Sequence, residues 1–245
     1  MKNHVFIAAC VFSKNYPDLA KITQDYVRQR FDMSIMRCCV KDFKTKIYED
    51  AMAESMRERW KSLPQYIDMD DDDVMVYICH NCSAIFQEQM PNIKILSFWE
   101  LVLMDEDFPY PNYSQEKMTV QDCWRSRDNP TEQNAVRQLL EKMNIQIVEQ
   151  EIKGKDTEFC GVSLYQPSPP KNTRLAPKRF VENAKGKFIS HSEEEQKKLM
   201  EEYCSNITTD KVVAYCHYCD DGLNIGGKTS LHLAELLFQP ETIKK

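Results

Sequence analysis

The sequence predicts an α/β protein made of two similar cysteine-rich modules with mainly parallel sheets. Short apolar, β-branched runs alternate along the chain with stretches whose apolar residues recur at helical spacing. In addition, a strand that runs into a Cys-x-x-Cys motif occurs twice, at 73–82 and at 210–219, with an aspartate and a histidine in matching places. Matched copies of this kind indicate an internal duplication. Because parallel strands end at one edge of a sheet, we expect the cysteines to gather there.

The first module is predicted to span residues 1–110. Its elements, in order, are a strand from His4 to Cys10, a helix from Pro17 to about Phe31, a strand or buried turn over 33–39, a helix over 47–61, a strand over 73–78, a short helix, a strand over 93–97 and a helix over 98–104. In the 47–61 helix the apolar residues available to a core are Ile47, Met52, Met56 and Trp60. The acidic run 68–73 lacks the glycine and terminal glutamate of a calcium loop, so it is predicted to be a solvated loop.

The second module, residues 111–245, begins within a loop rich in Asp, Pro and Tyr at 105–116, which is the predicted boundary between the modules. Its predicted elements are a strand over 118–122, a helix from Pro130 to Met143 with Asn129 as its N-cap, a strand over 145–148, a Pro-rich loop over 167–182, a helix from a capping box at 192–195 to Tyr203, a strand over 211–215 and a helix over 231–238.

Composition narrows the function. The chain has 245 residues, a net charge of −6 and no basic cluster with interleaved aromatics, so nucleic acid is not an expected partner. It has no apolar run long enough to span a membrane and no signal peptide, so we expect a cytoplasmic protein. Ten cysteines are unusual in that compartment, where disulfides seldom persist, and they favour a metal or redox role over disulfides.

Nine of the ten cysteines fall into one repeating scheme. The first copy has Cys10, the pair Cys38-Cys39, and Cys79-His-Asn-Cys82, whereas the second has Cys123, Phe159-Cys160-Gly161, and Cys216-His-Tyr-Cys219. Over nearly the whole chain this scheme resembles the CCG domain, the cysteine-rich module of the heterodisulfide reductase family and its relatives. That resemblance implies that five cysteines of a complete module bind a non-cubane [4Fe-4S] cluster and that a disulfide substrate binds where the two modules face each other.

The scheme also departs from that family. Val40 stands in place of the glycine after the first pair, and Phe159 stands in place of a cysteine, which leaves four thiols in the second copy. The resemblance therefore implies a five-thiolate cluster at the first site, formed by Cys10, Cys38, Cys39, Cys79 and Cys82. At the second site, Cys123, Cys160, Cys216 and Cys219 suffice for a [4Fe-4S] cubane or for zinc. Cys204 has no place in the scheme and is expected to be a core thiol or a displaced fifth ligand.

These expectations lead to a redox hypothesis. The chain would be an oxidoreductase of the heterodisulfide reductase type, active in anaerobic metabolism, with the first five cysteines and His80 at the catalytic centre. It has no Gly-x-Gly-x-x-Gly fingerprint, so electrons would come from a flavoprotein or ferredoxin-like partner subunit and pass to or from a thiol/disulfide substrate. Two alternatives stay open: a non-catalytic, metal-stabilised electron-relay or structural subunit, and thioredoxin-like exchange at one Cys-x-x-Cys. His217 matches His80, and either histidine could hydrogen-bond to sulfur, donate a proton or simply pack.

Overall fold

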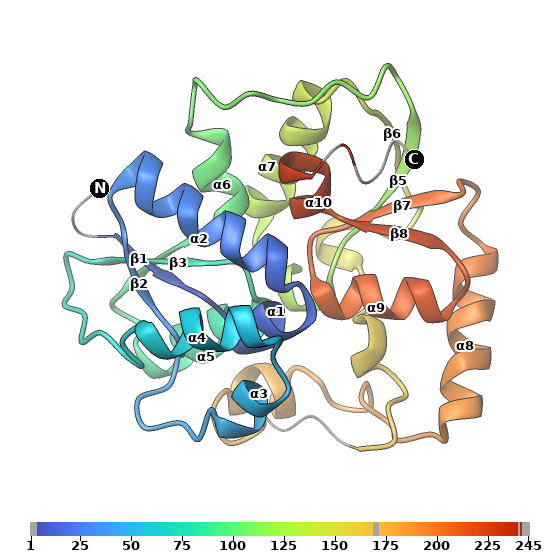
Figure 1. The fold of residues 1–245 in the computed structure, drawn as a ribbon. Helices are drawn as coiled ribbons and strands as arrows, with labels where there is room; N and C mark the ends of the chain where they lie inside the picture. The colour runs from blue at the N-terminus through green and yellow to red at the C-terminus, as the bar shows by residue number, and fades with distance from the viewer. Residues whose placement is uncertain (1–3, 169–171, 240, 242–245) are drawn as a thin grey trace. The chain divides into compact units, whose positions relative to one another are not determined.

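The computed structural model describes residues 4–168, 172–239 and 241 (Figure 1). The chain divides into two compact units, Met1–Leu101 (unit 1) and Val102–Lys245 (unit 2). The predicted boundary lies a little further along, between residues 110 and 111. Part of the predicted Pro-rich loop, residues 169–171, lies outside the described residues.

Unit 1 contains a four-stranded parallel sheet in the order β2-β1-β3-β4. The central strands are almost entirely buried because Val and Ile side chains on both faces meet helices. The elements are β1 (His4–Ile7), α1 (Cys10–Asn15), α2 (Pro17–Phe31), β2 (Ser34–Met36), α3 (Lys46–Asp50), α4 (Glu54–Ser62), β3 (Val74–Tyr77), α5 (His80–Gln89), β4 (Lys94–Ser97) and α6 (Phe98–Leu103), the last of which runs across the unit boundary.

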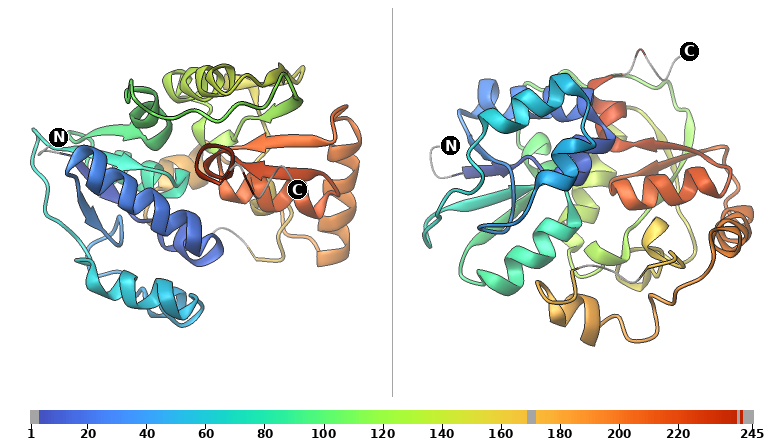
Figure 2. Two further views of the ribbon diagram at one scale, coloured as in Figure 1. Left: turned by 45° about the horizontal axis from the view of Figure 1, so that its top comes forward. Right: turned by 60° about the horizontal axis from the view of Figure 1, so that its bottom comes forward.

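Unit 2 repeats this topology, with a parallel sheet in the order β6-β5-β7-β8. Figure 2 shows helices lying beside each of the two sheets. The elements are β5 (Lys117–Gln121), the 3₁₀ turn η1 (Trp124–Ser126), α7 (Pro130–Lys142), β6 (Gln146–Val148), the 3₁₀ turns η2 (Gly154–Asp156) and η3 (Gly161–Ser163), the π-helical turn η4 (Lys178–Glu182), α8 (Glu193–Ser205), β7 (Lys211–Ala214), α9 (His217–Ile225), β8 (Thr229–His232) and α10 (Leu233–Phe238).

The predicted α/β class with two parallel sheets is confirmed. Two of the predicted helix starts are also correct in their chemistry. The Asn129 side chain accepts a hydrogen bond from the backbone N–H of Glu132 and caps α7. Ser192 and Glu195 form a reciprocal capping box at the start of α8, which satisfies N–H groups that have no partner within the helix.

The predicted helix over 47–61 is wrong as a single helix. It is divided into α3 and α4 by a break at 51–53, where the Arg57 side chain donates to the backbone carbonyls of Glu49, Asp50 and Met52. These bonds satisfy carbonyls at the end of α3 that a continuous helix would have satisfied itself. Of the four predicted core residues, Met52, Met56 and Trp60 are buried, whereas Ile47 is 67% exposed.

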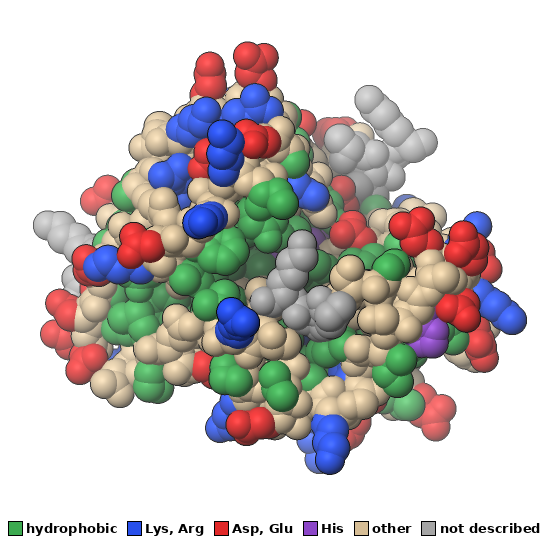
Figure 3. All heavy atoms as spheres, turned by 90° about the horizontal axis from the view of Figure 1, so that it is seen from below, with side chains coloured by type: hydrophobic (Ala, Val, Ile, Leu, Met, Phe, Trp, Pro, Cys, Tyr) green, Lys and Arg blue, Asp and Glu red, His purple; other side chains and the backbone are tan. Residues whose placement is uncertain are grey.

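Other departures are smaller. The sequence analysis missed α1, which begins at Cys10, and it missed β8, whose residues were partly assigned to the last helix. On the surface, Figure 3 shows one face of the molecule, where acidic and basic side chains are interspersed with neutral and apolar ones.

Candidate functional site

Each sheet has a point at which the strand order reverses. In unit 1 this point lies between β1 and β3, because the chain leads from β1 outward to β2 and from β3 outward to β4 on the other side. Ligands of open parallel sheets bind outside the carboxyl ends of the strands at such a point. Cys10 begins the helix that follows β1, and Cys79 is the N-cap of the helix that follows β3. The chain therefore places two of the predicted site residues where this fold forms binding sites.

The five predicted cysteines of unit 1 come together in a single thiol cluster. Cys39 accepts hydrogen bonds from the thiols of Cys38 and Cys82, and the Cys82 thiol also hydrogen-bonds to Cys79. Cys10 lies within electrostatic reach of Cys79 and Cys39. Residues far apart in the sequence therefore meet here, with interactions that connect all five sulfurs.

Two of these five cysteines differ from the rest in exposure. Cys38, Cys79 and Cys82 are buried, whereas Cys10 and Cys39 are partly exposed. Hydrogen bonds from Cys38 and from Cys82 lower the pKa of Cys39 to about 5, because they stabilise the thiolate. Burial, together with the nearby sulfurs of Cys79 and Cys39, raises the pKa of Cys10 well above its usual range. At neutral pH the two partly exposed residues therefore differ in form, with Cys39 a thiolate and Cys10 a thiol.

Tyrosine side chains lie beside the unit 1 cluster. Burial, followed by the sulfurs of Cys10 and Cys38, raises the pKa of Tyr48 to about 12, so its phenol is a hydrogen-bond donor at neutral pH. Burial is also the first cause that raises the pKa of Tyr66, whose ring lies 6.0 Å from the ammonium group of Lys41. Neither tyrosine was singled out from the sequence, because nothing in the local pattern relates α3 or the 64–67 loop to the strand ends.

Unit 2 brings its four predicted cysteines together in the same topological place. Cys123 is the N-cap of the turn after β5, and Cys216 is the N-cap of the helix after β7. The thiols of Cys160 and Cys219 hydrogen-bond to Cys123, and that of Cys219 also hydrogen-bonds to Cys216. Unlike the unit 1 cluster, this one is closed, since each of the four is at most 1% exposed.

The unit 2 cluster contains a cation that the sequence analysis missed. The guanidinium of Arg125, a residue only 4% exposed, donates to Cys160 Sγ at 2.8 Å and to Ser163 Oγ at 2.8 Å. Burial alone would lower the pKa of Arg125, but the sulfurs of Cys160 and Cys123 more than offset this and raise it. A buried guanidinium requires an anionic partner, and the cluster sulfurs are the groups placed to supply it.

Two positions of the predicted scheme have clear structural explanations. Phe159, in the place of a cysteine, stacks on Tyr203 with ring centroids 4.2 Å apart, so an aromatic pair fills the space of the missing thiol. Gly161 has φ +55°, and a Cβ there would lie 1.6 Å from the backbone oxygen of Tyr218. Glycine is therefore required for the close approach of the Cys160 loop to α9. Val40, which follows the other pair, is half-buried.

The remaining predicted residues are buried. His80 and His217 occupy the first positions of α5 and α9 and are 1% and 0% exposed. His80 packs edge-on to Tyr77, and His217 lies 4.4 Å from the Tyr218 ring centroid. Cys204 lies on α8, where its thiol faces the carbonyl oxygen of Leu223 at 3.8 Å. None of the ten cysteines, all of which the structure describes, forms a disulfide.

Comparisons with known proteins give no family. No protein-family model matches the chain, and no curated protein matches it. Among solved structures, an aspartate racemase homologue from Pyrococcus horikoshii is 13% identical, with a TM-score of 0.32 and full coverage of both chains. Glutamate racemase from Aquifex pyrophilus is 11% identical, with a TM-score of 0.34, over 100% of this chain and 84% of that one. A glutamate racemase from Bacillus anthracis is 12% identical, with a TM-score of 0.31, over 98% and 80%.

These findings correct the family and redox predictions. The three structures are described as glutamate racemases and an aspartate racemase homologue, not as iron-sulfur proteins, and no CCG family model matches, so the resemblance to the heterodisulfide reductase family is wrong. The predictions of an iron-sulfur oxidoreductase, of electron transfer, of anaerobic metabolism and of a metal-stabilised relay subunit fall with it. The identities and TM-scores are too low for the activity of the racemases to be assigned to this chain.

The cofactor prediction is corrected on the same findings. One or two [4Fe-4S] clusters, with zinc as the alternative at the second site, were inferred from the family resemblance that the comparisons overturn. At the second site there is also a physical reason against the predicted cluster or zinc, because the Arg125 guanidinium already supplies a positive charge beside Cys160. The predicted electron-transfer partner and the predicted thiol/disulfide substrate rested on the same family resemblance and are corrected with it. Ligation of a metal by the nine cysteines stays a prediction.

Among the described residues, no helix is both long and apolar enough to cross a membrane.

Proposed function

We propose that the chain is an isomerase-type enzyme in which unit 1 moves a proton on a carbon acid, with thiols as the acid and the base and without a cofactor. The observation that carries this proposal is the pair of partly exposed cysteines, Cys39 and Cys10, whose pKa values are shifted in opposite directions. Two like groups whose environments separate their pKa values are the arrangement expected of a catalytic base and acid.

Cys39 is the proposed base. A reactive cysteine is a thiolate in a partly exposed setting, and the hydrogen bonds from Cys38 and Cys82 hold Cys39 in that form. Cys38 and Cys82 are positioning residues in this scheme, because they act through Cys39. Cys79, whose thiol neighbours Cys82 and Cys10, supports the same arrangement. His80 is not given a role, since its ring is buried.

Cys10 is the proposed acid. Its raised pKa keeps the proton on sulfur until a carbanion forms nearby. The Cys39 thiolate takes a proton from carbon, and the Cys10 thiol gives a proton back to the carbanion, which leaves Cys39 as a thiol and Cys10 as a thiolate. A proton exchange through solvent then restores the starting forms, and no oxidant or reductant is consumed. The substrate class that fits is a compound with a C–H bond beside a carboxyl or carbonyl group.

The setting fits a reducing compartment. The proposed chemistry needs Cys10 and Cys39 reduced and outside any disulfide, a state that persists in the cytoplasm, where the sequence led us to expect the protein. The mixture of acidic and basic side chains on the surface supports a small-molecule substrate over nucleic acid.

The test is exchange of carbon-bound hydrogen in D₂O, followed by ¹H NMR for a panel of α-amino acids, 2-hydroxy acids and 2-oxo acids. We expect at least one class to exchange, with Cys39→Ser and Cys10→Ser reducing the rate at least 100-fold, as loss of a catalytic acid or base does. Cys204→Ser is the matched control, because Cys204 lies in the other unit, and it should keep the full rate.

A chelator arm separates this proposal from metal catalysis. The rate should be unchanged after EDTA treatment and buffer exchange. Exchange that survives Cys39→Ser, or that disappears with the chelator and returns with added metal ions, would show that the thiol pair is not the catalyst. Failure of every substrate class to exchange would likewise count against the assignment.

A further inference from the structure

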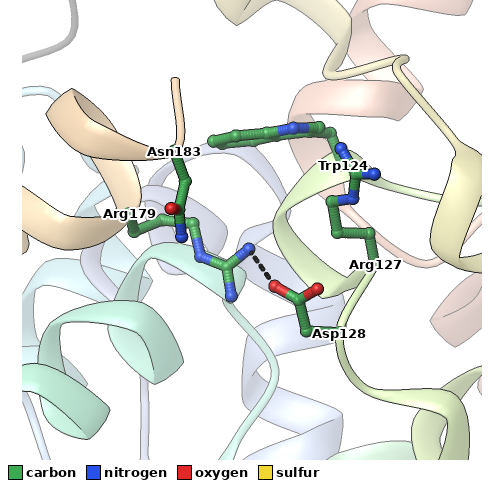
Figure 4. A pocket seen from close by; sticks show the side chains of 5 residues that line it. All are labelled: Trp124, Arg127, Asp128, Arg179 and Asn183. Carbon is green, nitrogen blue, oxygen red and sulfur yellow. Dashed lines mark ion pairs between the residues drawn. The ribbon is translucent and has the colours of Figure 1, made fainter. Parts of the chain in front are cut away.

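Unit 2 contains a pocket beside the turn that follows Cys123, and none of the cysteines lines it. Its volume is about 300 Å³, at the lower end of the range for small-molecule sites, and it is lined by Trp124, Arg127, Asp128, Arg179 and Asn183 (Figure 4). One wall comes from the turn between β5 and α7, and the other comes from η4 and the residue that follows it. η4 is π-helical, a conformation that is often found at functional sites.

Of the two arginines that line the pocket, Arg179 is the more buried. Its side chain is 13% exposed, and its guanidinium lies 5.7 Å from the ring centre of Trp124, which holds the group by a cation–π contact. Its ion-pair partner is Asp128, with Arg179 Nη1 and Asp128 Oδ2 2.9 Å apart. Asn183 follows Arg179 by four residues, and both side chains line the pocket (Figure 4).

The ion pair between Arg179 and Asp128 is weak. The Asp128 side chain is 63% exposed, and an ion pair with so exposed an acid contributes about 0–1 kcal/mol. A carboxylate from solution has the same shape as the group it would displace, and a guanidinium binds it through two parallel hydrogen bonds. Moving the Asp128 carboxylate into water therefore costs little free energy, and the largely buried guanidinium of Arg179 is already in position.

The charges around Trp124 favour an anion. Arg179, Arg127 and Lys187 supply three positive charges, and Asp128 and Glu158, their ion-pair partners, supply two negative charges, which leaves one positive charge in excess. Lys187 also lies 5.5 Å from the Trp124 ring centre. One excess charge, in a small pocket, matches a monoanion and leaves a dianion such as a phosphate ester only half neutralised.

We infer that this pocket binds a small organic monocarboxylate, whose carboxylate accepts hydrogen bonds from Arg179 and Asn183 in place of Asp128. This assignment does not depend on the proposed function of unit 1. Asp128 acts as a competitor built into the chain, so it lowers the affinity of the site while keeping Arg179 paired when no ligand is present.

The test is a titration of the full-length ¹⁵N-labelled protein with benzoate at fixed ionic strength, with the indole N–H signal of Trp124 as the readout. Benzamide, which has nearly the same shape and no charge, is the matched control ligand, and inorganic phosphate is the dianion control. Arg179→Gln removes the cation, and Asp128→Asn removes the competitor. The backbone amide signals of unit 2 report whether each variant keeps its fold, because both substitutions lie in that unit.

We expect saturable binding of benzoate to the unmodified chain, with benzamide and phosphate each at least tenfold weaker. Arg179→Gln should weaken benzoate at least tenfold, and Asp128→Asn should strengthen it several-fold. These opposite effects distinguish a carboxylate site from a general loss of structure. The inference is overturned by absence of saturable benzoate binding to the unmodified chain, by equal binding of benzamide, or by unchanged affinity in Arg179→Gln.

Discussion

The guanidinium of Arg125 donates a hydrogen bond to the sulfur of Cys160, 2.8 Å away, in the interior of unit 2. The rings of Phe180, Phe188 and Tyr218 surround the guanidinium at 4.8 to 5.9 Å, so this cation is packed in an aromatic and sulfur environment. The pair explains how four thiols and an arginine can share one core, because each side lowers the cost of burying the other.

The first prediction concerns this pair. Cys160→Ala should lower the free energy of unfolding by about 3 kcal/mol, because it removes the sulfur that compensates a buried guanidinium. Arg125→Met should cost a similar amount. The double variant should cost clearly less than the sum of the two, since it leaves neither group without its partner. Urea unfolding of the three variants measures this, and additive losses would mean that the two residues do not interact.

The second prediction concerns the turn after Cys160. Gly161→Ala should destabilise the protein by about 3 kcal/mol or more, because it adds left-handed strain of about 1–2 kcal/mol and a collision with the backbone of Tyr218. Gly186→Ala is the control, since Gly186 has φ +76° and nothing within 4 Å of an added Cβ. Gly186→Ala should lower the free energy of unfolding only by the left-handed strain, about 1 kcal/mol. Equal losses in the two variants would contradict the close approach.

The third prediction is the pH profile of Cys39. Alkylation by iodoacetamide, mapped by mass spectrometry, should rise around pH 5 and then stay level between pH 6 and 8 at this residue, since its thiolate is already formed. Cysteines in the urea-unfolded chain should instead rise about tenfold per pH unit up to their ordinary pKa of about 8.5. Cys38→Ala should move the Cys39 midpoint upward, because it removes one of the two donors.

The same shift has a consequence for stability. The pKa of Cys39 is lower in the folded state than in the unfolded chain, so ionisation favours folding. This contribution is complete above the unfolded pKa of about 8.5 and is lost as the pH falls through about 5. The difference in unfolding free energy between the unmodified chain and Cys39→Ser should therefore shrink from pH 8 to pH 5. A difference that grows toward low pH would mean that Cys39 is a thiol.

Much of the fold followed from local pattern. Buried β-branched runs such as 74–77 and 211–214 identified strands, and the caps at Asn129 and Ser192 identified helix starts, because both signals depend on neighbouring residues alone. The break between α3 and α4 did not follow, since it depends on the Arg57 side chain folding back onto three carbonyls. The short strand β8 was hidden in a run that also suits a helix.

The site followed in part. The repeated spacing of cysteines predicted that they meet at strand ends, and they do. The chemistry did not follow, because the pattern cannot tell which sulfur is exposed or which donors it has. The buried cation at Arg125 had one sequence signal, its position two residues after Cys123. A single arginine in a turn is more often on the surface, so this signal is weak. The pocket at Arg179 gave none, since its walls lie about 50 residues apart in the chain.

The shared strand order of the two sheets means that each unit has its own complete set of strand ends and its own sulfur cluster. Such redundancy permits a division of labour between the copies. The cluster beside Arg125 is fully buried and is part of the interior of unit 2. The unit 1 cluster is partly exposed at Cys39 and Cys10, so substitutions near these residues disturb less of the interior. The same arrangement of strand ends thus carries a fully buried cluster in one unit and a partly exposed one in the other.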